Sequence, residues 1–203
     1  MGRAKWMLGS HNSMSYLRSK TWWGRLFRFV AQCQQKNVVE QWESGVRYYD
    51  LRVGYDSEWN VEFRHGAIAY QQLGVRGEEL GVEGVLEWLE NRAGATGEPV
   101  WVRVILEKER KSRVAGACVE MFRAYCKRWE QAYPSLLFHC GRRKRDWKQL
   151  YDFGREEPSM EQAVSSMTWK VWDDWCPRIY AWFMNKKKLQ QGTDKQVLLI
   201  DFV

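Results

Sequence analysis

Short apolar runs that end in polar groups alternate along the chain with stretches of helical periodicity. The first run, residues 6–8, is stopped by a Gly-Ser pair, so we expect a buried strand that delivers His11 onto the loop beyond it. Residues 46–53 are rich in β-branched and aromatic side chains, which predicts a second strand. Because side chains alternate along a strand, Asp50 and Arg52 lie on the same side of it.

Further strands are predicted by alternation or by apolar content. Trp59, Val61 and Phe63 alternate with polar residues, which predicts a half-buried strand that ends at His65. Other strand candidates cover residues 100–106, 136–138, 170–172 and 197–203, and the last of these has the clearest buried pattern. Polar residues therefore stand at the ends of several predicted strands.

Helical spacing occupies the segments between these strands. Apolar residues recur three and four positions apart over residues 82–89 and again over residues 114–129, and a further helix is expected around residues 179–185. Glycines and Pro99 end the first helix, and Pro134 follows the second. We expect the second apolar stripe to pack on the outside of a barrel.

Alternating strands and helices with polar groups at the strand ends predict an α/β barrel, in which active sites lie at the C-terminal ends of the strands. A chain of 203 residues is close to the lower limit for a complete barrel. We therefore expect an irregular or reduced TIM (β/α) barrel, formed by residues 1–203 as a single domain.

The net positive charge of the chain indicates that its binding partners are anionic. The net charge of +7 attracts nucleic acid, anionic lipid headgroups or phosphate compounds, and 13 tryptophans in a basic chain favour a membrane interface, although core packing accounts for most of them. Trp22, Trp23 and Phe27 lie in a basic, aromatic segment after the first loop, and Trp182 precedes a run of lysines. These four residues are candidate membrane contacts. The alternative is that they cap the barrel and face inward.

The cysteines and the N-terminal residues give information on the cellular compartment of the protein. Five cysteines occur with no CxxC pair, which favours reduced thiols over a disulfide framework or a zinc knuckle. The first residues lack the apolar stretch of a signal peptide, and no apolar run is long enough to span a membrane. We expect a soluble, uncleaved chain that is cytoplasmic, or secreted after processing.

Three motifs in a fixed order resemble those of a known family. The segment GSHNS begins at Gly9, the block QWESGVRYYDLR covers residues 41–52, and His65-Gly66 follows. Together they resemble the X-domain of phosphatidylinositol-specific phospholipases C, whose patterns are approximately G-[TS]-H-[DN]-S, Q-L-x-x-G-[VI]-R-[YF]-x-D-[LI]-R and H-G. The C-terminal LLIDFV, residues 198–203, is similar to the closing strand of that family.

The resemblance implies a reaction and a role for each matched residue. The inositol 2-hydroxyl of phosphatidylinositol, or of its glycosylated anchors, attacks the phosphorus, expels diacylglycerol and leaves an inositol cyclic phosphate. His11 matches the general base and His65 the general acid, and imidazole suits both roles because it titrates near neutral pH. Arg52 supplies positive charge to the phosphate, Asp201 orients the base, and Asp50 lies beside the acid histidine and the phosphate.

Arg52 also bears on metal dependence. An arginine at this position resembles the bacterial-type enzymes, whereas calcium-dependent members carry an acidic residue, so we expect no metal cofactor. Asn12 and Glu107, which we expect to bind substrate, resemble calcium-ligand positions of the eukaryotic members. The alternative is therefore calcium coordinated by Asn12, Asp50 and Glu107.

A less closely matched stretch, WDDW at residues 172–175, resembles the family segment that contacts the inositol ring. Asp173 would then bind inositol hydroxyls, and Trp175 would stack on the ring. The alternative is a buried tryptophan beside a surface aspartate.

Two other functions stay open. One is a catalytically silent barrel that binds anionic membranes or phosphoinositides, and the presence of His11, Arg52 and His65 argues against it. The other is a metal-dependent glycerophosphodiester phosphodiesterase, which a chelator would inactivate. A nucleic-acid partner is not expected because no recognition motif accompanies the basic residues. We expect a monomer in peripheral contact with a membrane surface.

Overall fold

The computed structural model describes residues 6–26, 32–71, 81–108, 116–143, 147–163 and 177–203. Its main sheet has the strand order β7-β6-β5-β2-β1-β9-β8. The strands of this sheet are β1 (Met7–Ser10), β2 (Val46–Tyr55), β5 (Val100–Lys108), β6 (Leu136–Arg143), β7 (Trp147–Tyr151), β8 (Met160–Ala163) and β9 (Val197–Ile200). The predicted strands at residues 6–8, 46–53, 100–106 and 136–138 therefore occur as β1, β2, β5 and β6.

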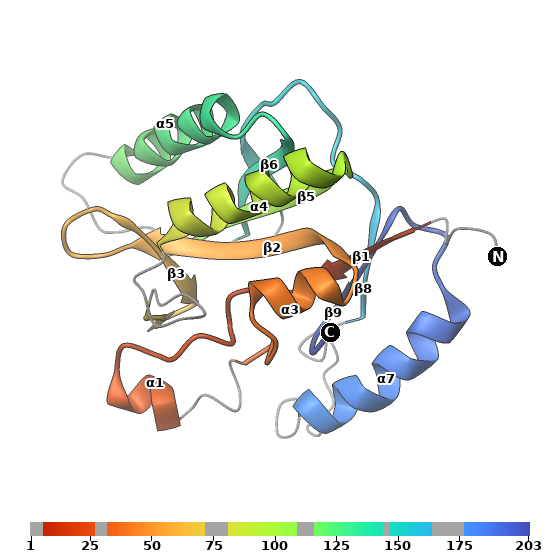
Figure 1. Cartoon of the computed structure of the whole chain (residues 1–203). Coiled ribbons are helices and arrows are strands. Elements are labelled where there is room, and N and C mark those ends of the chain that lie inside the picture. The colour runs from red at the N-terminus through yellow and green to blue at the C-terminus, as the bar shows by residue number, and fades with distance from the viewer. Residues whose placement is uncertain (1–5, 27–31, 72–80, 109–115, 144–146, 164–176) are drawn as a thin grey trace.

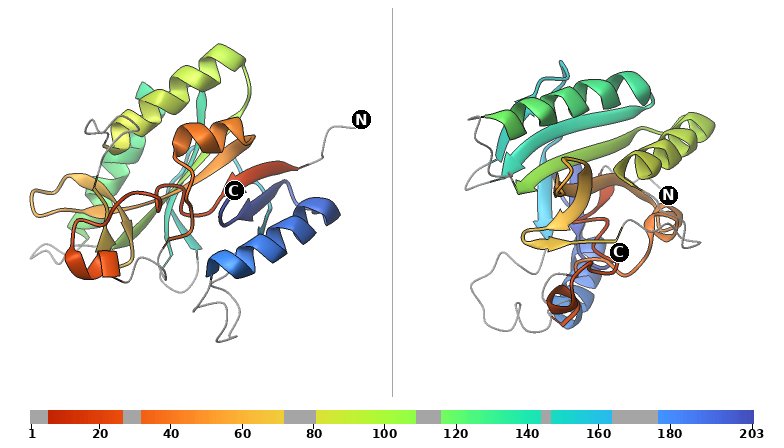
Figure 2. Two further views of the ribbon diagram at one scale, coloured as in Figure 1. Left: turned by 60° about the horizontal axis from the view of Figure 1, so that its bottom comes forward. Right: turned by 90° about the vertical axis from the view of Figure 1, so that its left-hand side faces the viewer.

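The sheet is mostly parallel and curled. Neighbouring strands pair in parallel from β6 through to β8, and only β7 joins this path antiparallel, at its β6 edge. Figures 1 and 2 show the curl, and among the described strands the sheet is open between β7 and β8. The chain thus forms a mixed α/β domain on a half-barrel, which confirms the prediction of a reduced TIM barrel.

A hairpin extends from the middle of this sheet. β3 (Val61–His65) pairs antiparallel with β2 and with the short β4 (Ile68–Ala69). The strand predicted from Trp59 begins later, at Val61, because Trp59 has a positive φ of 70° in the turn before it. Asp56 closes that turn by accepting a hydrogen bond from the Asn60 N–H at 2.9 Å.

Helices connect the strands and cover the convex side. α4 (Val82–Thr96) buries the apolar positions at helical spacing that predict it, and α5 (Ala117–Ala132) buries the stripe that ends at Trp129. Both lie above the sheet in Figure 1. α7 (Pro177–Gln191) contains the helix predicted around residues 179–185.

Two short helices had no sequence prediction, α1 (Trp22–Leu26) and α3 (Val38–Glu43). α3 starts with a capping box, in which Asn37 accepts from the Glu40 N–H and the Glu40 carboxylate accepts from the Asn37 N–H. This cap orients the chain between β1, which His11 follows, and β2, which contains Asp50.

The C-terminal strand is shorter than predicted. β9 ends at Ile200 because Phe202 has a positive φ of 50° and its N–H donates to the Cys33 carbonyl at 2.7 Å instead of to the sheet. Asp201 is therefore a loop residue at the end of the strand. The strand predicted at residues 170–172 and the beginning of the helix predicted over 114–129 lie outside the described residues.

Four of the five cysteines are described by the structure, and they are buried thiols that form no disulfide with one another, namely Cys33, Cys118, Cys126 and Cys140.

The concave face of the sheet carries a row of polar residues in an otherwise apolar interior. In the sheet register Asp50 of β2 lies opposite Arg103 of β5, and Arg103 lies opposite His139 of β6. Ser10 of β1 lies opposite Ile200 of β9, so the next residues, His11 and Asp201, extend the row on the other side. All five side chains are at least 95% buried.

Candidate functional site

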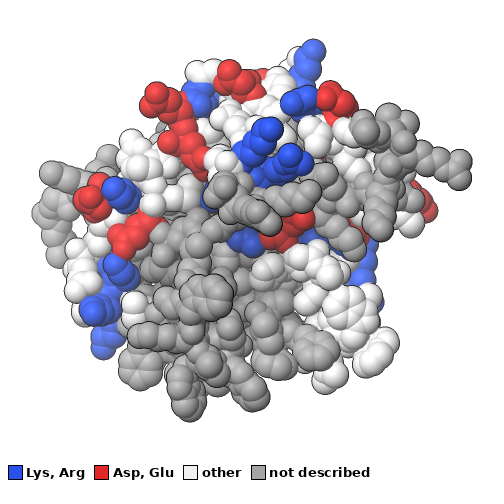
Figure 3. Space-filling view, turned by 180° about the vertical axis from the view of Figure 1, so that it is seen from behind, with Lys and Arg blue, Asp and Glu red and all other residues white. Residues whose placement is uncertain are grey.

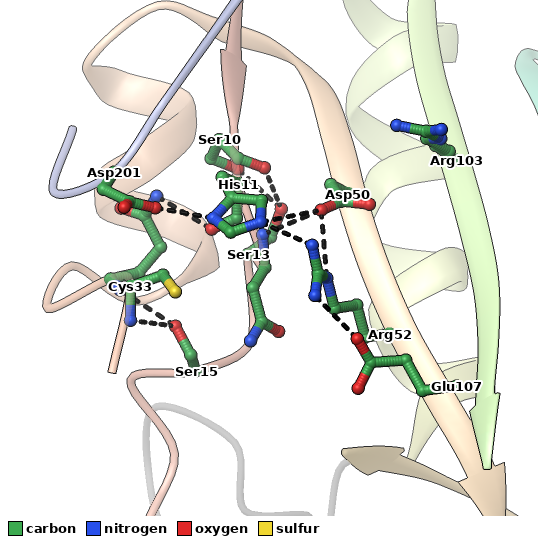
Figure 4. A network of polar contacts seen from close by, with 12 residues as sticks. Ser10, His11, Ser13, Ser15, Cys33, Asp50, Arg52, Arg103, Glu107 and Asp201 are labelled. Carbon is green, nitrogen blue, oxygen red and sulfur yellow. Dashed lines mark hydrogen bonds and ion pairs between the residues drawn. The ribbon is translucent and has the colours of Figure 1, made fainter. Parts of the chain in front are cut away.

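His11 and Asp201 meet at the ends of two parallel strands. The His11 N–H donates to the Ile200 carbonyl at 2.9 Å, and Nδ1 of the His11 ring lies 2.6 Å from Oδ1 of Asp201. Each residue is followed by one with positive φ, 45° at Asn12 and 50° at Phe202, which turns both chains away from the sheet directly after the polar side chain. The strand ends thereby hold the pair in place, as Figure 4 shows.

The contacts of the imidazole define its protonation. Nε2 of His11 lies 2.5 Å from Nη2 of Arg52, and a guanidinium has only donors, so Nε2 must accept. Nδ1 then carries the proton and donates to Asp201. This tautomer keeps a lone pair on the nitrogen that faces the concave side of the sheet, which a general base requires.

Asp50 lies on the Arg52 side of the imidazole. Its Oδ2 accepts from the Asn12 N–H at 3.1 Å and from Nε of Arg52 at 3.3 Å. Complete burial opposes ionisation of this carboxyl, but the guanidinium of Arg52, His11 and the guanidinium of Arg103 outweigh the burial and hold its pKa below the ordinary value. Asp50 is therefore a carboxylate at neutral pH.

Arg52 connects this part of the site to the His65 loop. Nη1 of Arg52 lies 2.6 Å from Oε1 of Glu107, and Oε2 of Glu107 accepts from the Gly66 N–H. Asp50 and Glu107 together raise the pKa of Arg52 although burial opposes this, so the guanidinium is permanently charged. Because β3 runs back along β2, with Val53 opposite Phe63, His65 returns toward the level of Arg52.

These contacts bear on the calcium alternative. Two of the three expected ligands, Asp50 and Glu107, are ion-paired with the guanidinium of Arg52, which lies between them. The third, Asn12, is buried, and its Nδ2, a donor that cannot ligate a cation, has no hydrogen-bond partner among the described residues. A cation would have to displace Arg52 before it reached both carboxylates.

A second layer of buried polar side chains, which the sequence did not reveal, holds the backbone around the His11–Asp201 pair. The buried amide of Gln34 donates to the carbonyls of His11 at 3.1 Å and Ile200 at 3.0 Å, and its oxygen accepts from the Val203 N–H at 3.1 Å. On the other side, Asn185 of α7 donates to the Asp201 carbonyl. A glutamine in a loop and an asparagine on a helix give no sequence signal for such a role, because their partners are backbone groups near the ends of distant strands.

The same layer holds Cys33 against the pair. Ser15 Oγ accepts from the Cys33 N–H at 2.9 Å, and the Cys33 thiol hydrogen bonds with the Asp201 carboxylate. Burial and then the charge of Asp201 raise the pKa of the thiol well above its ordinary value, so Cys33 is a neutral donor.

Arg103 is a further polar residue that the sequence analysis missed. It sits in the apolar run WVRVIL, where an arginine signals a buried charge that needs partners. Its Nε lies 3.3 Å from Oε1 of Glu157, and its guanidinium carbon lies 4.2 Å from the centre of the Trp147 ring. Arg103 thereby places a second positive charge next to Asp50.

Three of the predicted membrane-contact residues are exposed. The exposed fraction is 74% for Trp22 and 36% for Trp23 on α1, and 66% for Trp182 on α7, and Leu26 on α1 is also exposed. Figure 1 shows both helices on the lower side of the molecule, away from α4 and α5. Phe27, Asp173 and Trp175 lie outside the described residues.

Two further surface properties concern membranes. In the described part of the chain, no helix is long and apolar enough to cross a bilayer. Among the described residues on the face that Figure 3 presents, basic and acidic side chains are interspersed, so these basic side chains form no patch of one sign.

The fold resembles that of bacterial phosphatidylinositol-specific phospholipases C. The structure resembles that of the enzyme from Staphylococcus aureus, with a TM-score of 0.62 and 14% sequence identity over 97% of this chain and 85% of the other. It also resembles the enzyme from Listeria monocytogenes, with a TM-score of 0.59 and 14% identity over 97% and 87% of the two chains. No protein-family model and no curated protein matches the sequence. The similarity is thus one of fold.

Proposed function

We propose that this protein is a phospholipase C that cleaves phosphatidylinositol or glycosylphosphatidylinositol. One observation carries the proposal, namely the buried line Asp201–His11–Arg52 at the strand ends of a half-barrel. In it, one ring nitrogen is bound to a carboxylate and the other faces a guanidinium. The likeness of the fold to phosphatidylinositol-specific phospholipases C supports the choice of substrate.

In the first step His11 acts as the general base. The inositol 2-hydroxyl replaces Arg52 as the partner of Nε2, and its proton passes to that nitrogen as the oxygen attacks phosphorus. Asp201 stabilises the resulting imidazolium through the 2.6 Å contact with Nδ1. The carboxylate thereby makes the ring a stronger base in the transition state.

Arg52 then stabilises the charge that gathers on the phosphoryl oxygens. It is held by Asp50 and Glu107, so its orientation costs little entropy when the phosphate binds. His65 acts as the general acid that protonates the departing diacylglycerol oxygen. The products are diacylglycerol and an inositol cyclic phosphate.

The arrangement favours a reaction without a metal cofactor. Arg52 ion-pairs with the carboxylates that a calcium ion would need, and supplies the positive charge at the same place. Turnover that survives excess chelator is the expected result. Turnover that requires added calcium would favour the alternative ligand set.

Exposed aromatic residues support action at a membrane surface. Trp22 and Trp182 present large apolar areas on helices at one side of the molecule. Replacing both by alanine is expected to lower turnover on vesicles of phosphatidylinositol but not on a dispersed short-chain substrate, because only the first requires surface binding.

The reaction is tested by incubating the protein with phosphatidylinositol vesicles and following the phosphorus NMR signal of the cyclic phosphate. We expect product with the wild type, none above background with His11→Ala, and strongly reduced product with Asp201→Asn. Arg128→Ala, an exposed change on α5, is the matched control. Vesicles that bind the protein without product formation would leave only the silent membrane-binding barrel.

A further inference from the structure

Cys33 lies on the far side of the imidazole from Arg52, and its thiol faces the same edge of His11 as Asp201 (Figure 4). Nδ1 of His11, Sγ of Cys33 and a carboxylate oxygen of Asp201 all lie within 4.8 Å of one another, and all three residues are buried. The reaction proposed above uses His11 and Asp201 but gives Cys33 no role. We propose that these three residues form an inhibitory site for a thiophilic divalent cation such as Zn²⁺.

The geometry is close to that of a three-residue zinc site. Tetrahedral zinc binds sulfur, nitrogen and oxygen at about 2.0–2.3 Å, which sets its ligand atoms roughly 3 to 4 Å apart. The 2.6 Å contact between His11 and Asp201 must therefore open slightly, and the thiol must move inward. The backbone of Cys33 is already fixed by Ser15 and by Phe202.

The ligand types select the ion. A thiolate and a carboxylate together carry two negative charges, which neutralise one divalent cation inside a buried cluster. Sulfur and imidazole ligands favour zinc over magnesium and calcium, which prefer oxygen. Loss of the thiol proton is the only net deprotonation, since His11 binds the ion as a neutral ring.

Occupancy of this site disables the general base, a consequence that rests on the proposed function. An imidazole that binds a cation through Nδ1 keeps its remaining proton on Nε2. Nε2 then donates instead of accepting, so it cannot take the proton of the inositol hydroxyl, and Arg52 must turn away from it. Zn²⁺ is thus expected to inhibit without contacting the substrate.

Binding is tested without turnover by titrating the full chain with Co²⁺, which reports a thiolate ligand by a charge-transfer absorption band. We expect the band in the wild type and in Cys118→Ser, the matched control with a buried thiol elsewhere. We expect Cys33→Ser to lose it and to bind Zn²⁺ more weakly by about 10- to 100-fold or more. A wild type with no such band, or a band that survives in Cys33→Ser, overturns the site.

A second measurement on the wild type avoids any folding defect of the variant. The chain has three histidines, so a nitrogen-15 NMR spectrum of labelled histidine can follow Nδ1 of His11 on addition of Zn²⁺. We expect this resonance to shift, and an unchanged spectrum would refute the site.

Activity then separates this inference from the proposed function. Zn²⁺ is expected to lower phosphatidylinositol cleavage by about tenfold or more in the wild type and in Cys118→Ser, but much less in Cys33→Ser. A cobalt band without lipid cleavage would preserve the metal site and refute the proposed function. Lipid cleavage that is insensitive to Zn²⁺ would refute the inhibitory role alone.

Discussion

The row of polar residues on the concave face has two halves that differ in their hydrogen-bond partners. The first half surrounds His11, Arg52 and Asp201, and the second half contains Arg103 and His139. Around Asp201 and His11, Gln34 and Asn185 bind the backbone, and both ring nitrogens of His11 have a fixed partner, Asp201 on one side and Arg52 on the other. Toward β5 and β6, Nε2 of His139 and Nε of Arg103 are buried without a hydrogen-bond partner among the described residues, although Arg103 is close to Glu157.

The difference separates two tasks. Groups that move protons must be held in one geometry, and a fixed partner on each ring nitrogen of His11 does this. Buried polar atoms without a partner cost free energy, and a bound molecule with hydroxyl groups lowers that cost. On the proposed function, the first half performs the chemistry, and the second half faces the inositol ring.

Removing the guanidinium of Arg52 is expected to have the largest effect on turnover. Arg52→Ala should lower turnover by about a hundredfold or more, because the charge on the phosphoryl oxygens loses its stabilisation. Steady-state kinetics on phosphatidylinositol would measure this. Arg47→Ala is the control, since Arg47 lies on the same strand but pairs with the exposed Glu98. An Arg52→Ala rate equal to the wild type would remove the arginine from the mechanism.

Gln34 forms a backbone clamp, because its side chain binds backbone groups of His11, Ile200 and Val203. Removing this clamp should act first on the stability of the fold. Gln34→Ala removes three hydrogen bonds and leaves the buried carbonyls of His11 and Ile200 without them, so we expect a loss of about 1–3 kcal/mol in the free energy of unfolding. Urea denaturation would measure it, with the exposed Gln149→Ala as the control. Equal midpoints for the two variants would contradict the clamp.

The second half is expected to act on the first through charge. Arg103→Met removes a positive charge that helps to keep the pKa of Asp50 low, so that pKa should rise and the acid side of the pH–rate profile should move to higher pH. We expect turnover at neutral pH to fall by about tenfold or less. Arg103→Lys should largely restore the profile. A uniform loss of rate at all pH values would indicate a packing defect instead.

The smallest expected effect concerns His139. Burial, Arg155 and Arg103 lower its pKa to about 4, and its ring stacks on Trp101 with 4.9 Å between ring centres. Because the unfolded state binds a proton near pH 6.5 and the folded state only near pH 4, stability should fall as the pH drops through that interval, by about 1–2 kcal/mol. Denaturation at pH 7 and pH 4.5 would show it, and His139→Phe should lack this component.

Much of the architecture could be predicted from local patterns. The strands β1, β2, β5 and β6 and the helices α4 and α5 follow from apolar periodicity, because burial of one face is a property of neighbouring residues. The short elements α1, α3, β7 and β8 have weak periodicity and were not predicted. The trimmed end of β9 could not be predicted either, because a contact with Cys33 decides it.

The sequence by itself determined which polar residues follow apolar runs, since a histidine or an aspartate after such a run is visible without a structure. Only the tertiary structure decided which of them meet. His11 and Asp201 are 190 positions apart and are joined by the parallel pairing of β1 with β9, and Cys33 and Arg103 reach the same row through loops and sheet register. Such contacts depend on how distant strands align, and that free energy has no signature in any short stretch of the chain.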